Sequence, residues 1–264
     1  MIKLQGITKY FHRGSVNEVL ALEGINLDVR RGDFITIIGS NGAGKSTLLN
    51  CLAGSCHVDE GKITIDGKNV TPWPEYRRAG LISRVFQNPL MGTCASLNIE
   101  QNLAIAARRG HTHGLGKGVK GRDRDLFREK LRHLGLELEG RLKDDVGLLS
   151  GGQRQALTML MATMVRPKVL LLDEHTAALD PKIAQCILEL TKRVVEDDRL
   201  TTMMVTHNMK QALRMGNRLV MMHRGRIILD VDGDEKALLK VEDLIERFYT
   251  AGGEEFSQDR MLLV

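Results

Sequence analysis

The sequence predicts an α/β fold in which a parallel sheet is covered by helices, with an antiparallel β subdomain at the start and a helical subdomain inserted in the middle. Three observations carry this prediction. After Ser150, apolar runs of strand length alternate with helical segments, which is typical of parallel sheets. The first third is dominated by strand patterns. Residues 88–146 contain helical patterns without a strong strand.

The composition fits a globular chain with an aliphatic core. Of the 264 residues, 42% are hydrophobic, 27% charged and only 4% aromatic, which suits a domain that buries a continuous core. The first ten residues alternate apolar and polar types and lack the apolar stretch of a secretory signal. Apolar runs such as 169–172 are too short to cross a bilayer. We therefore expect a cytoplasmic protein whose membrane role depends on another chain.

The four cysteines give no sign of a metal site or a disulfide framework. They are Cys51, Cys56, Cys94 and Cys186, and none forms a CxxC pair. Such spacing predicts neither zinc binding nor disulfides. We expect buried, reduced thiols.

The positive charge is concentrated in one segment. The formal net charge is +5, yet residues 108–132 contain nine Lys or Arg against three Asp or Glu. The rest of the chain is close to neutral, so a nucleic-acid partner is not expected. Two interpretations stay open for this segment: a solvated, mobile connection, or a contact with anionic lipid head groups or a membrane partner.

The first third predicts strands around a glycine-rich loop. Residues 25–30 alternate as in a half-buried strand, and the apolar run 34–38 has the length of a buried strand. The loop 39–44 follows, and residues 45–53 have helical character. Residues 61–67 form a further alternating strand between glycines.

The middle and the last part predict helices and then strands in alternation. Helices are expected at 97–107 and 126–134, joined by a Gly/Lys/Arg-rich loop around 111–121. The elements expected after Ser150 are a helix at 153–165, a strand at 169–173, a helix at 182–195, a strand at 202–206, a helix at 209–215, a hairpin at 219–229 and a closing helix with Leu238, Val241, Ile245 and Phe248 on one face.

The glycine-rich loop carries the sharpest chemical signal. Residues 39–46 read Gly-Ser-Asn-Gly-Ala-Gly-Lys-Ser and match G-x-x-x-x-G-K-[ST] between an apolar strand and a helix. Glycines let backbone N–H groups approach phosphate, and the helix N-terminus favours an anion. Lys45 is expected at the β- and γ-phosphates and Ser46 at Mg²⁺. A chance glycine turn explains this full match poorly, so the core is predicted to be that of a P-loop NTPase.

A second signal supplies the acidic half of such a site. The apolar strand 169–172 ends in Asp173 and Glu174. Carboxylates at the carboxyl end of such a strand face the ligand crevice of an open α/β sheet. Asp173 suits Mg²⁺, and Glu174 suits the activation of the attacking water. Alone the pair is an ordinary strand end, but together with the phosphate loop it predicts an ATPase.

A third motif resembles one family. Residues 149–153 read Leu-Ser-Gly-Gly-Gln and are similar to the LSGGQ signature of ABC transporter ATP-binding subunits. The resemblance covers residues 1–230. It implies that Gln87 is the glutamine of the Q-loop, that Asp180 belongs to the D-loop and that His207 senses the γ-phosphate. It also implies that Phe11 stacks on adenine, with Tyr10 as its nearest competitor.

The resemblance extends the site to a set of residues. It implies catalytic functions for Lys45, Gln87, Glu174 and His207, and it implies Mg²⁺ ligands at Ser46, Gln87 and Asp173. The residues expected at ATP are Phe11, Gly39, Ser40, Asn41, Gly42, Ala43, Gly44, Lys45, Ser46, Thr47, Gln87, Ser150, Gly151, Gly152, Gln153, Asp173 and Asp180.

The signature segment implies a dimer. Ser150-Gly151-Gly152 repeats the logic of the phosphate loop at another helix start, although one nucleotide needs only one such cradle. The resemblance implies that the second cradle serves a neighbouring copy, so that two ATP molecules lie between two head-to-tail subunits. The alternative is a Ser-Gly-Gly helix cap without a ligand.

Two positions depart from the family pattern. His175 follows Glu174 where the family usually has proline, and Asn208 follows His207 where aspartate is common. A different loop geometry is expected after Glu174.

The resemblance also implies a domain organisation. The expected parts are a core with its β subdomain at 1–87 and 147–231, a helical subdomain at 88–146, and a C-terminal helix and tail at 232–264.

The expected system is an uptake transporter. No membrane domain is fused to the chain, and too few residues follow the last hairpin for a regulatory domain. Residues 83–89 and 96–103 resemble ATPases of bacterial uptake systems, and among these a group linked to aromatic amino acids. This implies integral-membrane permease subunits, an extracytoplasmic solute-binding protein and a place on the inner face of the membrane.

Three alternatives stay open. The first is the ATPase of a lipoprotein- or peptide-export complex. The second is a non-transport ABC ATPase acting on nucleic acid or ribosomes. The third, a P-loop kinase or GTPase, would not need the signature segment.

Overall fold

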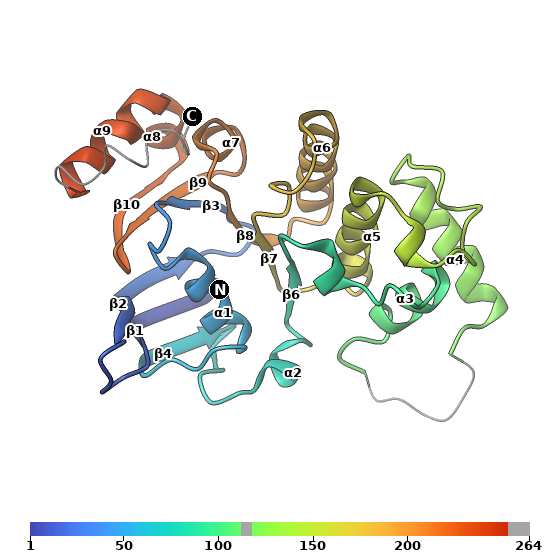
Figure 1. The fold of residues 1–264 in the computed structure, drawn as a ribbon, viewed down its shortest axis with the longest axis horizontal. Helices are drawn as coiled ribbons and strands as arrows, with labels where there is room; N and C mark the ends of the chain where they lie inside the picture. Colours follow the sequence, from blue (N-terminus) through green and yellow to red (C-terminus); the bar gives the residue numbers. More distant parts are fainter. Residues whose placement is uncertain (112–117, 253–264) are drawn as a thin grey trace. The chain divides into compact units, whose positions relative to one another are not determined.

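The computed structural model describes residues 1–111 and 118–252, and within them the chain divides into two compact units. The first unit combines residues 1–78 with the chain from Leu200 onward, and the second unit is Ala79–Arg199 (Figure 1). None of the helices in the described residues combines the length and apolar character needed to span a bilayer.

An antiparallel sheet opens the first unit. It consists of β1 (Ile2–Phe11), β2 (Val19–Val29), β4 (Glu60–Ile65) and β5 (Lys68–Asn69), in the order β2-β1-β4-β5. Figure 1 labels β1, β2 and β4. Buried and exposed residues alternate along much of β2, because one face of the sheet packs inward. The expectation of an antiparallel β-rich start is confirmed.

The second group of strands in this unit surrounds β3 (Phe34–Gly39). It pairs in parallel with β8 (Thr201–Val205) and with β9 (Arg218–His223), and β9 turns back into β10 (Arg226–Asp232) as an antiparallel hairpin. Every residue of β3 and β8 is buried. This explains why both read as continuous strand-length runs rather than as alternating patterns.

Among the described residues, the first unit contains five helices. They are α1 (Lys45–Ala53), α2 (Glu75–Arg78), α7 (Met209–Arg214), α8 (Gly233–Leu238) and α9 (Val241–Gly252).

The closing segment is two helices rather than the single helix expected. Leu238 ends α8 and is 80% exposed, so it does not share the apolar face. The chain is extended at Leu239, and α9 starts only at Val241. Leu244 and Phe248 of α9 are buried in a core cluster with residues of α7, β9 and β10. The prediction was therefore right for Phe248 and wrong for Leu238.

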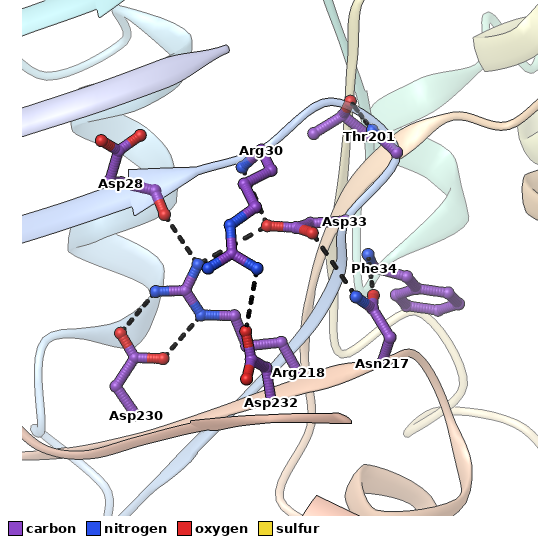
Figure 2. Close-up of polar contacts among 10 residues, drawn as sticks. Asp28, Arg30, Asp33, Phe34, Thr201, Asn217, Arg218, Asp230 and Asp232 are labelled. Atoms are coloured by element: carbon purple, nitrogen blue, oxygen red, sulfur yellow. Dashed lines mark hydrogen bonds and ion pairs between the residues drawn. The ribbon is translucent and has the colours of Figure 1, made fainter. Parts of the chain in front are cut away.

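A polar network joins the start of β3 to the last hairpin of this unit (Figure 2). Arg218 donates two hydrogen bonds of 2.6 Å to the carboxylate of Asp230 and a third, of 2.7 Å, to the carbonyl oxygen of Asp28. Its guanidinium also lies 3.5 Å from Asp33. Asn217 accepts a bond from the backbone N–H of Phe34 at 2.7 Å. These bonds fix the point where β3 enters the sheet.

The second unit holds two parallel strands and the helical insertion. Val85 of β6 (Ile82–Val85) lies opposite Leu172 of β7 (Val169–Asp173). The helices are η1 (Pro89–Gly92), α3 (Ile99–Ala106), α4 (Gly121–Arg132), η2 (Val146–Leu148), α5 (Gly151–Met164) and α6 (Pro181–Asp197).

The helical insertion has its own core. Leu103, Phe127, Leu131 and Leu157 belong to one buried cluster that joins α3, α4 and α5. Helix α4 starts five residues earlier than residue 126, where the apolar pattern places it. The reason is a polar first turn, in which the backbone N–H of Lys120 donates to Asp123 at 2.7 Å.

The described part of the basic segment forms helix α4 and several hydrogen bonds with other elements. Arg109 donates to the carbonyl oxygen of Val165, and Arg124 donates to Glu100 at 2.8 Å. Residues 121–132 form α4. Lys117 and the tail from residue 253 lie outside the described residues. In the described part, the segment thus includes helix α4, and most of its residues are exposed to solvent.

The cysteines are free thiols with different exposure. Cys51 is buried and Cys56 half-buried, whereas Cys94 and Cys186 are exposed. The expectation of buried thiols holds only for Cys51, because the other three follow helix ends or face solvent from α6.

Candidate nucleotide site

The phosphate loop lies between β3 and α1. Gly44 directly precedes α1 with φ 95°, a conformation that side chains disfavour. A Cβ added there would lie 2.5 Å from the carbonyl oxygen of Ala21. Glycine is therefore required by both conformation and space. Because α1 begins at Lys45, its first backbone N–H groups lie directly after the loop, as an anion cradle requires.

The lysine of this loop supports the turn from inside. Lys45 is 6% exposed, and its Nζ donates to the carbonyl oxygens of Gly39 at 2.8 Å and Ser40 at 3.0 Å. Asn41 and Ser46 are exposed. The ammonium group thus lies under the loop, and Ser46 at the start of α1 is an exposed residue.

The structure brings His207 to the same edge as this loop. Strands β3 and β8 are parallel, and the N–H of Thr206 donates to the carbonyl oxygen of Ile37 at 3.1 Å. The next residue is His207, which is exposed. Asn208 then caps α7 by accepting from the N–H of Gln211 at 2.9 Å. His207 is thus held between a paired strand and a capped helix.

The aromatic candidates lie at the end of β1. Phe11 is 38% exposed, and the Nζ of Lys9 lies 5.7 Å from its ring centroid. The guanidinium of Arg13 lies 4.6 Å from the ring centroid of Tyr10. Asp59 accepts from the N–H of Tyr10 at 2.6 Å, which fixes this strand end. Each of the two rings thus has a cation over one face, and these contacts do not distinguish Phe11 from Tyr10 as the residue at adenine.

The acidic half of the predicted site lies in the second unit. Because β6 and β7 are parallel, Gln87 and the pair Asp173 and Glu174 follow strands that end at one edge. Gln87 is exposed, Asp173 is 9% exposed, and Glu174 is half-buried. The structure therefore brings these three residues to the same edge of this unit.

Arg84 is a residue that the sequence analysis missed. Its Nη2 lies 2.6 Å from the Oδ2 of Asp173, and both side chains are largely buried. Its guanidinium also stacks 4.7 Å from the ring centroid of Phe86, next to Gln87. The available signal was a charged residue between the apolar residues Ile82 and Val85 of a strand.

The residue after Glu174 is deeply buried. His175 is 2% exposed, and its Nε2 lies 3.0 Å from the hydroxyl of Thr191 on α6. Burial lowers the pKa of His175 to about 4, because the charged imidazolium loses its hydration. The side chain is therefore neutral near pH 7. Glu174 itself has φ 45°.

Ser150 and Asp180 stand at the starts of two helices. The hydroxyl of Ser150 accepts from the N–H of Gln153 at 3.3 Å, and the side chain of Gln153 accepts from the N–H of Ser150. Asp180 accepts from the N–H of Ile183 at 3.1 Å. A Cβ at Gly152 would overlap Ile183. Ser150 therefore caps helix α5 through these hydrogen bonds. It is also exposed, so a second chain can contact it.

The predicted Mg²⁺ ligands have suitable chemistry. Ser46, Gln87 and Asp173 offer hydroxyl, amide and carboxylate oxygens. Mg²⁺ prefers oxygen ligands and usually binds through one or two carboxylates together with substrate phosphates and water. The donor set fits that ion. Ser46 belongs to the first unit and the other two residues to the second.

The comparisons with known proteins agree with this fold and these motifs. The family model described as ABC transporter matches residues 22–177. A tyrosine transport ATP-binding protein of Clostridioides difficile is 43% identical over 94% of this chain and 98% of its own length. A spermidine/putrescine import ATP-binding protein of Mycoplasma mycoides is 34% identical over 86% of this chain, which spans 60% of that relative.

Solved structures extend the agreement. A dimeric ATP-binding cassette in a post-hydrolysis state, bound to ADP and Pi, is 28% identical with a TM-score of 0.75, covering 88% of this chain and 98% of that one. A dimeric bacterial ABC transporter cassette is 30% identical with a TM-score of 0.74, again covering 88% and 98%.

A phosphate loop on an α/β core and a strand that ends in two carboxylates define the class of nucleotide-hydrolysing P-loop proteins. Within that class, this chain belongs to the ABC transporter family, as an ATP-binding subunit that hydrolyses ATP for transport.

Proposed function

We propose that this ATPase drives the uptake of tyrosine, or of a closely similar aromatic amino acid, through a separate membrane permease. The observation that carries the proposal is the 43% identity to a tyrosine transport ATP-binding protein over almost the full length of both chains. Other relatives import polyamines or methionine, but they share 32–35% identity over a smaller part of their own lengths. An extracytoplasmic solute-binding protein would deliver the amino acid.

The proposed chemistry assigns a function to the residues of each motif. The phosphate loop and Lys45 bind the β- and γ-phosphates, and Ser46, Gln87 and Asp173 would hold Mg²⁺, which would neutralise phosphate charge. Glu174 orients and deprotonates the attacking water, and His207 contacts the γ-phosphate. Positioning and neutralisation of charge supply most of the rate in phosphoryl transfer.

Two copies are proposed to share two nucleotides. The N-terminus of α5, where Ser150 is exposed, would complete the nucleotide site of the partner copy. The backbone N–H groups at the start of a helix attract anions such as phosphate. The dimeric cassettes among the similar structures support this arrangement. In this proposal, ATP binding closes the dimer and ATP hydrolysis opens it. These movements change the conformation of the permease.

The permease is proposed to contact the second unit at the inner face of the membrane. A hollow of about 370 Å³ there is lined mainly by apolar groups, among them Leu97, Ala104, Ile105 and Val119. Ile105 is 60% exposed, so a large apolar side chain is accessible to a partner there. The I105D variant should lose co-purification with the permease while the isolated chain keeps its ATP affinity. Unchanged co-purification would place the contact elsewhere.

Turnover tests the assignment of the base. Glu174→Gln should lower kcat by about a hundredfold to ten-thousandfold, because general-base catalysis contributes that much, while ATP affinity stays within about twofold. Glu189→Gln is the matched control, since Glu189 is an exposed glutamate on α6 that accepts a hydrogen bond from Gln185. A Glu174→Gln variant with the turnover of the unmodified chain would reject Glu174 as the base.

Uptake tests the substrate. Cells that lack this chain should lose high-affinity uptake of labelled tyrosine, and the unmodified chain should restore it where Glu174→Gln does not. Labelled spermidine and methionine serve as parallel substrates, because relatives are named for both. Loss of spermidine or methionine uptake with normal tyrosine uptake would reject the proposed substrate.

A further inference from the structure

The segment after the proposed base has an unusual backbone. Glu174 has φ 45°, in the left-handed region that non-glycine residues adopt rarely. A proline at the next position would push the residue before it toward extended backbone. His175 imposes no such restriction. The histidine therefore allows a conformation of Glu174 that proline would oppose.

A directed pair of hydrogen bonds ties His175 to the neighbouring helix. The hydroxyl of Thr191 donates to the carbonyl oxygen of Ile187 at 2.8 Å. A hydroxyl has one proton to donate, so at the 3.0 Å contact with the Nε2 of His175 it must accept. The imidazole therefore carries its proton on Nε2. Thr191 is 0% exposed, so water does not compete for this bond.

The rest of the segment consists of local turns. The N–H of Ala177 donates to the carbonyl oxygen of Glu174 at 3.0 Å, and the N–H of Leu179 donates to that of Thr176 at 3.2 Å. Asp180 then caps α6. The bond from His175 reaches much further along the chain, from the start of these turns to the middle of α6 (Pro181–Asp197).

We propose that His175 is a positioning residue for Glu174: its Nε2–H···Oγ1 bond to Thr191 fixes the turn that starts at Glu174 to α6 and thereby holds the carboxylate where it activates water. This rests on the proposed function of Glu174 as the base. Catalytic groups need placement within a fraction of an ångström, because a misplacement of about 1 Å costs about a hundredfold in rate. A buried bond one residue from the carboxylate controls such a placement directly.

Two pairs of variants test the bond from both ends. Thr191→Val keeps the shape and removes the acceptor, and Thr191→Ser restores the hydroxyl. His175→Ala removes the donor, and His175→Gln places an amide N–H near the position of Nε2. The measurements are kcat and KM for ATP, the equilibrium affinity for ATP, and thermal unfolding.

Thr158→Val is the matched control. Thr158 is 2% exposed, lies within helix α5 and donates to the carbonyl oxygen of Arg154 at 2.9 Å. It thus repeats the burial and the backbone bond of Thr191 without a histidine. The control reports the cost of losing a buried threonine hydroxyl as such.

The proposal predicts a fall in kcat of about tenfold to a hundredfold for Thr191→Val and His175→Ala, with KM and affinity for ATP within about twofold. Thr191→Ser and His175→Gln should recover most of the lost rate, and Thr158→Val should keep kcat within about twofold. A normal kcat in Thr191→Val, or an equal loss in Thr158→Val, would overturn it. Full turnover in Glu174→Gln would instead reject the base itself, so the two failures are distinguishable.

Discussion

At the scale of single residues, Asp173 has an ion pair that its position at the end of an apolar strand does not reveal. Arg84 lies 2.6 Å from it across the parallel pair β6 and β7, and the same guanidinium stacks on Phe86. A carboxylate that is proposed to hold Mg²⁺ thus has a positive charge beside it. Arg84 sets part of the electrostatic potential in which the divalent ion binds.

Replacing Arg84 by methionine should strengthen divalent binding. The substitution removes a positive charge next to Asp173, so Mn²⁺ in the presence of ATP should bind about threefold to tenfold more tightly, which corresponds to about 0.7–1.4 kcal/mol. Electron paramagnetic resonance of bound Mn²⁺ measures this affinity. Arg128→Met is the control, because Arg128 pairs with Asp125 on the surface. Weaker Mn²⁺ binding in the Arg84→Met variant would contradict the prediction.

The site residues could be predicted where a motif imposes local geometry. Gly44 is an example, because a left-handed residue before a helix needs glycine whatever surrounds it. The ion pair between Arg84 and Asp173 could not be predicted, and neither could the bond between His175 and Thr191. Both interactions join residues far apart in the sequence. Their partners depend on strand register and helix packing, which a single sequence does not contain.

At the scale of elements, the signature helix α5 shows why its two glycines differ. A Cβ at Gly151 would lie 3.5 Å from Leu179, an ordinary contact, whereas a Cβ at Gly152 would overlap the branched side chain of Ile183 on α6. Gly152 thus permits the close approach of α5 and α6. Gly151 is exposed.

The two alanine substitutions should therefore differ in stability. Gly152→Ala should lower the free energy of unfolding by about 1–3 kcal/mol, because overpacking forces the helices apart. Gly151→Ala should change it by less than about 1 kcal/mol, since alanine is tolerated in a helix where space allows. Urea unfolding of the nucleotide-free chain measures both. Equal stability of the two variants would contradict the packing argument.

A buried carboxylate stabilises the helical insertion. Glu100 is 4% exposed and accepts from Arg124 and Lys143, and the bond from Arg124 is the main reason that its pKa lies below the usual range. A depressed pKa stabilises the fold above the unfolded value of about 4.5, and this stability is lost as the pH falls through the folded value.

Glu100→Gln should lower the free energy of unfolding at pH 7 by about 1–2 kcal/mol, because it removes charge-assisted bonds whose cationic partners are partly solvated. The variant should also lose less stability than the unmodified chain when the pH falls below 4.5. Chemical unfolding at pH 7 and pH 4 tests both points. Asp125→Asn is the control for an exposed pair. Identical acid sensitivity of Glu100→Gln and the unmodified chain would contradict the prediction.

The bounds of an element could be predicted where a continuous apolar run marks a buried strand. Residues 34–38 and 169–173 were expected as strands, and β3 and β7 have nearly these bounds. The start of α4 was missed because its first turn is polar, and polar residues leave no periodic pattern. The break at Leu239 was missed because no proline or glycine marks it.

At the scale of the whole molecule, the central claim is that ATP joins two copies. The predicted site residues divide into a phosphate-loop set with Lys45 and His207 in the first unit and a set with Glu174 and Ser150 in the second. Ser150 is exposed at the N-terminus of the 14-residue helix α5. A second copy that supplies this helix start would complete each nucleotide site.

Light scattering of the Glu174→Gln variant tests that claim most directly. With slow hydrolysis, the variant should have twice the monomer mass in ATP and the monomer mass without nucleotide. Adding Ser150→Arg should abolish the dimer and leave ATP bound to the monomer, because a bulky cation blocks the helix start while the phosphate loop is unchanged. A monomer with ATP bound to Glu174→Gln alone, or a dimer that persists with Ser150→Arg, would contradict the account.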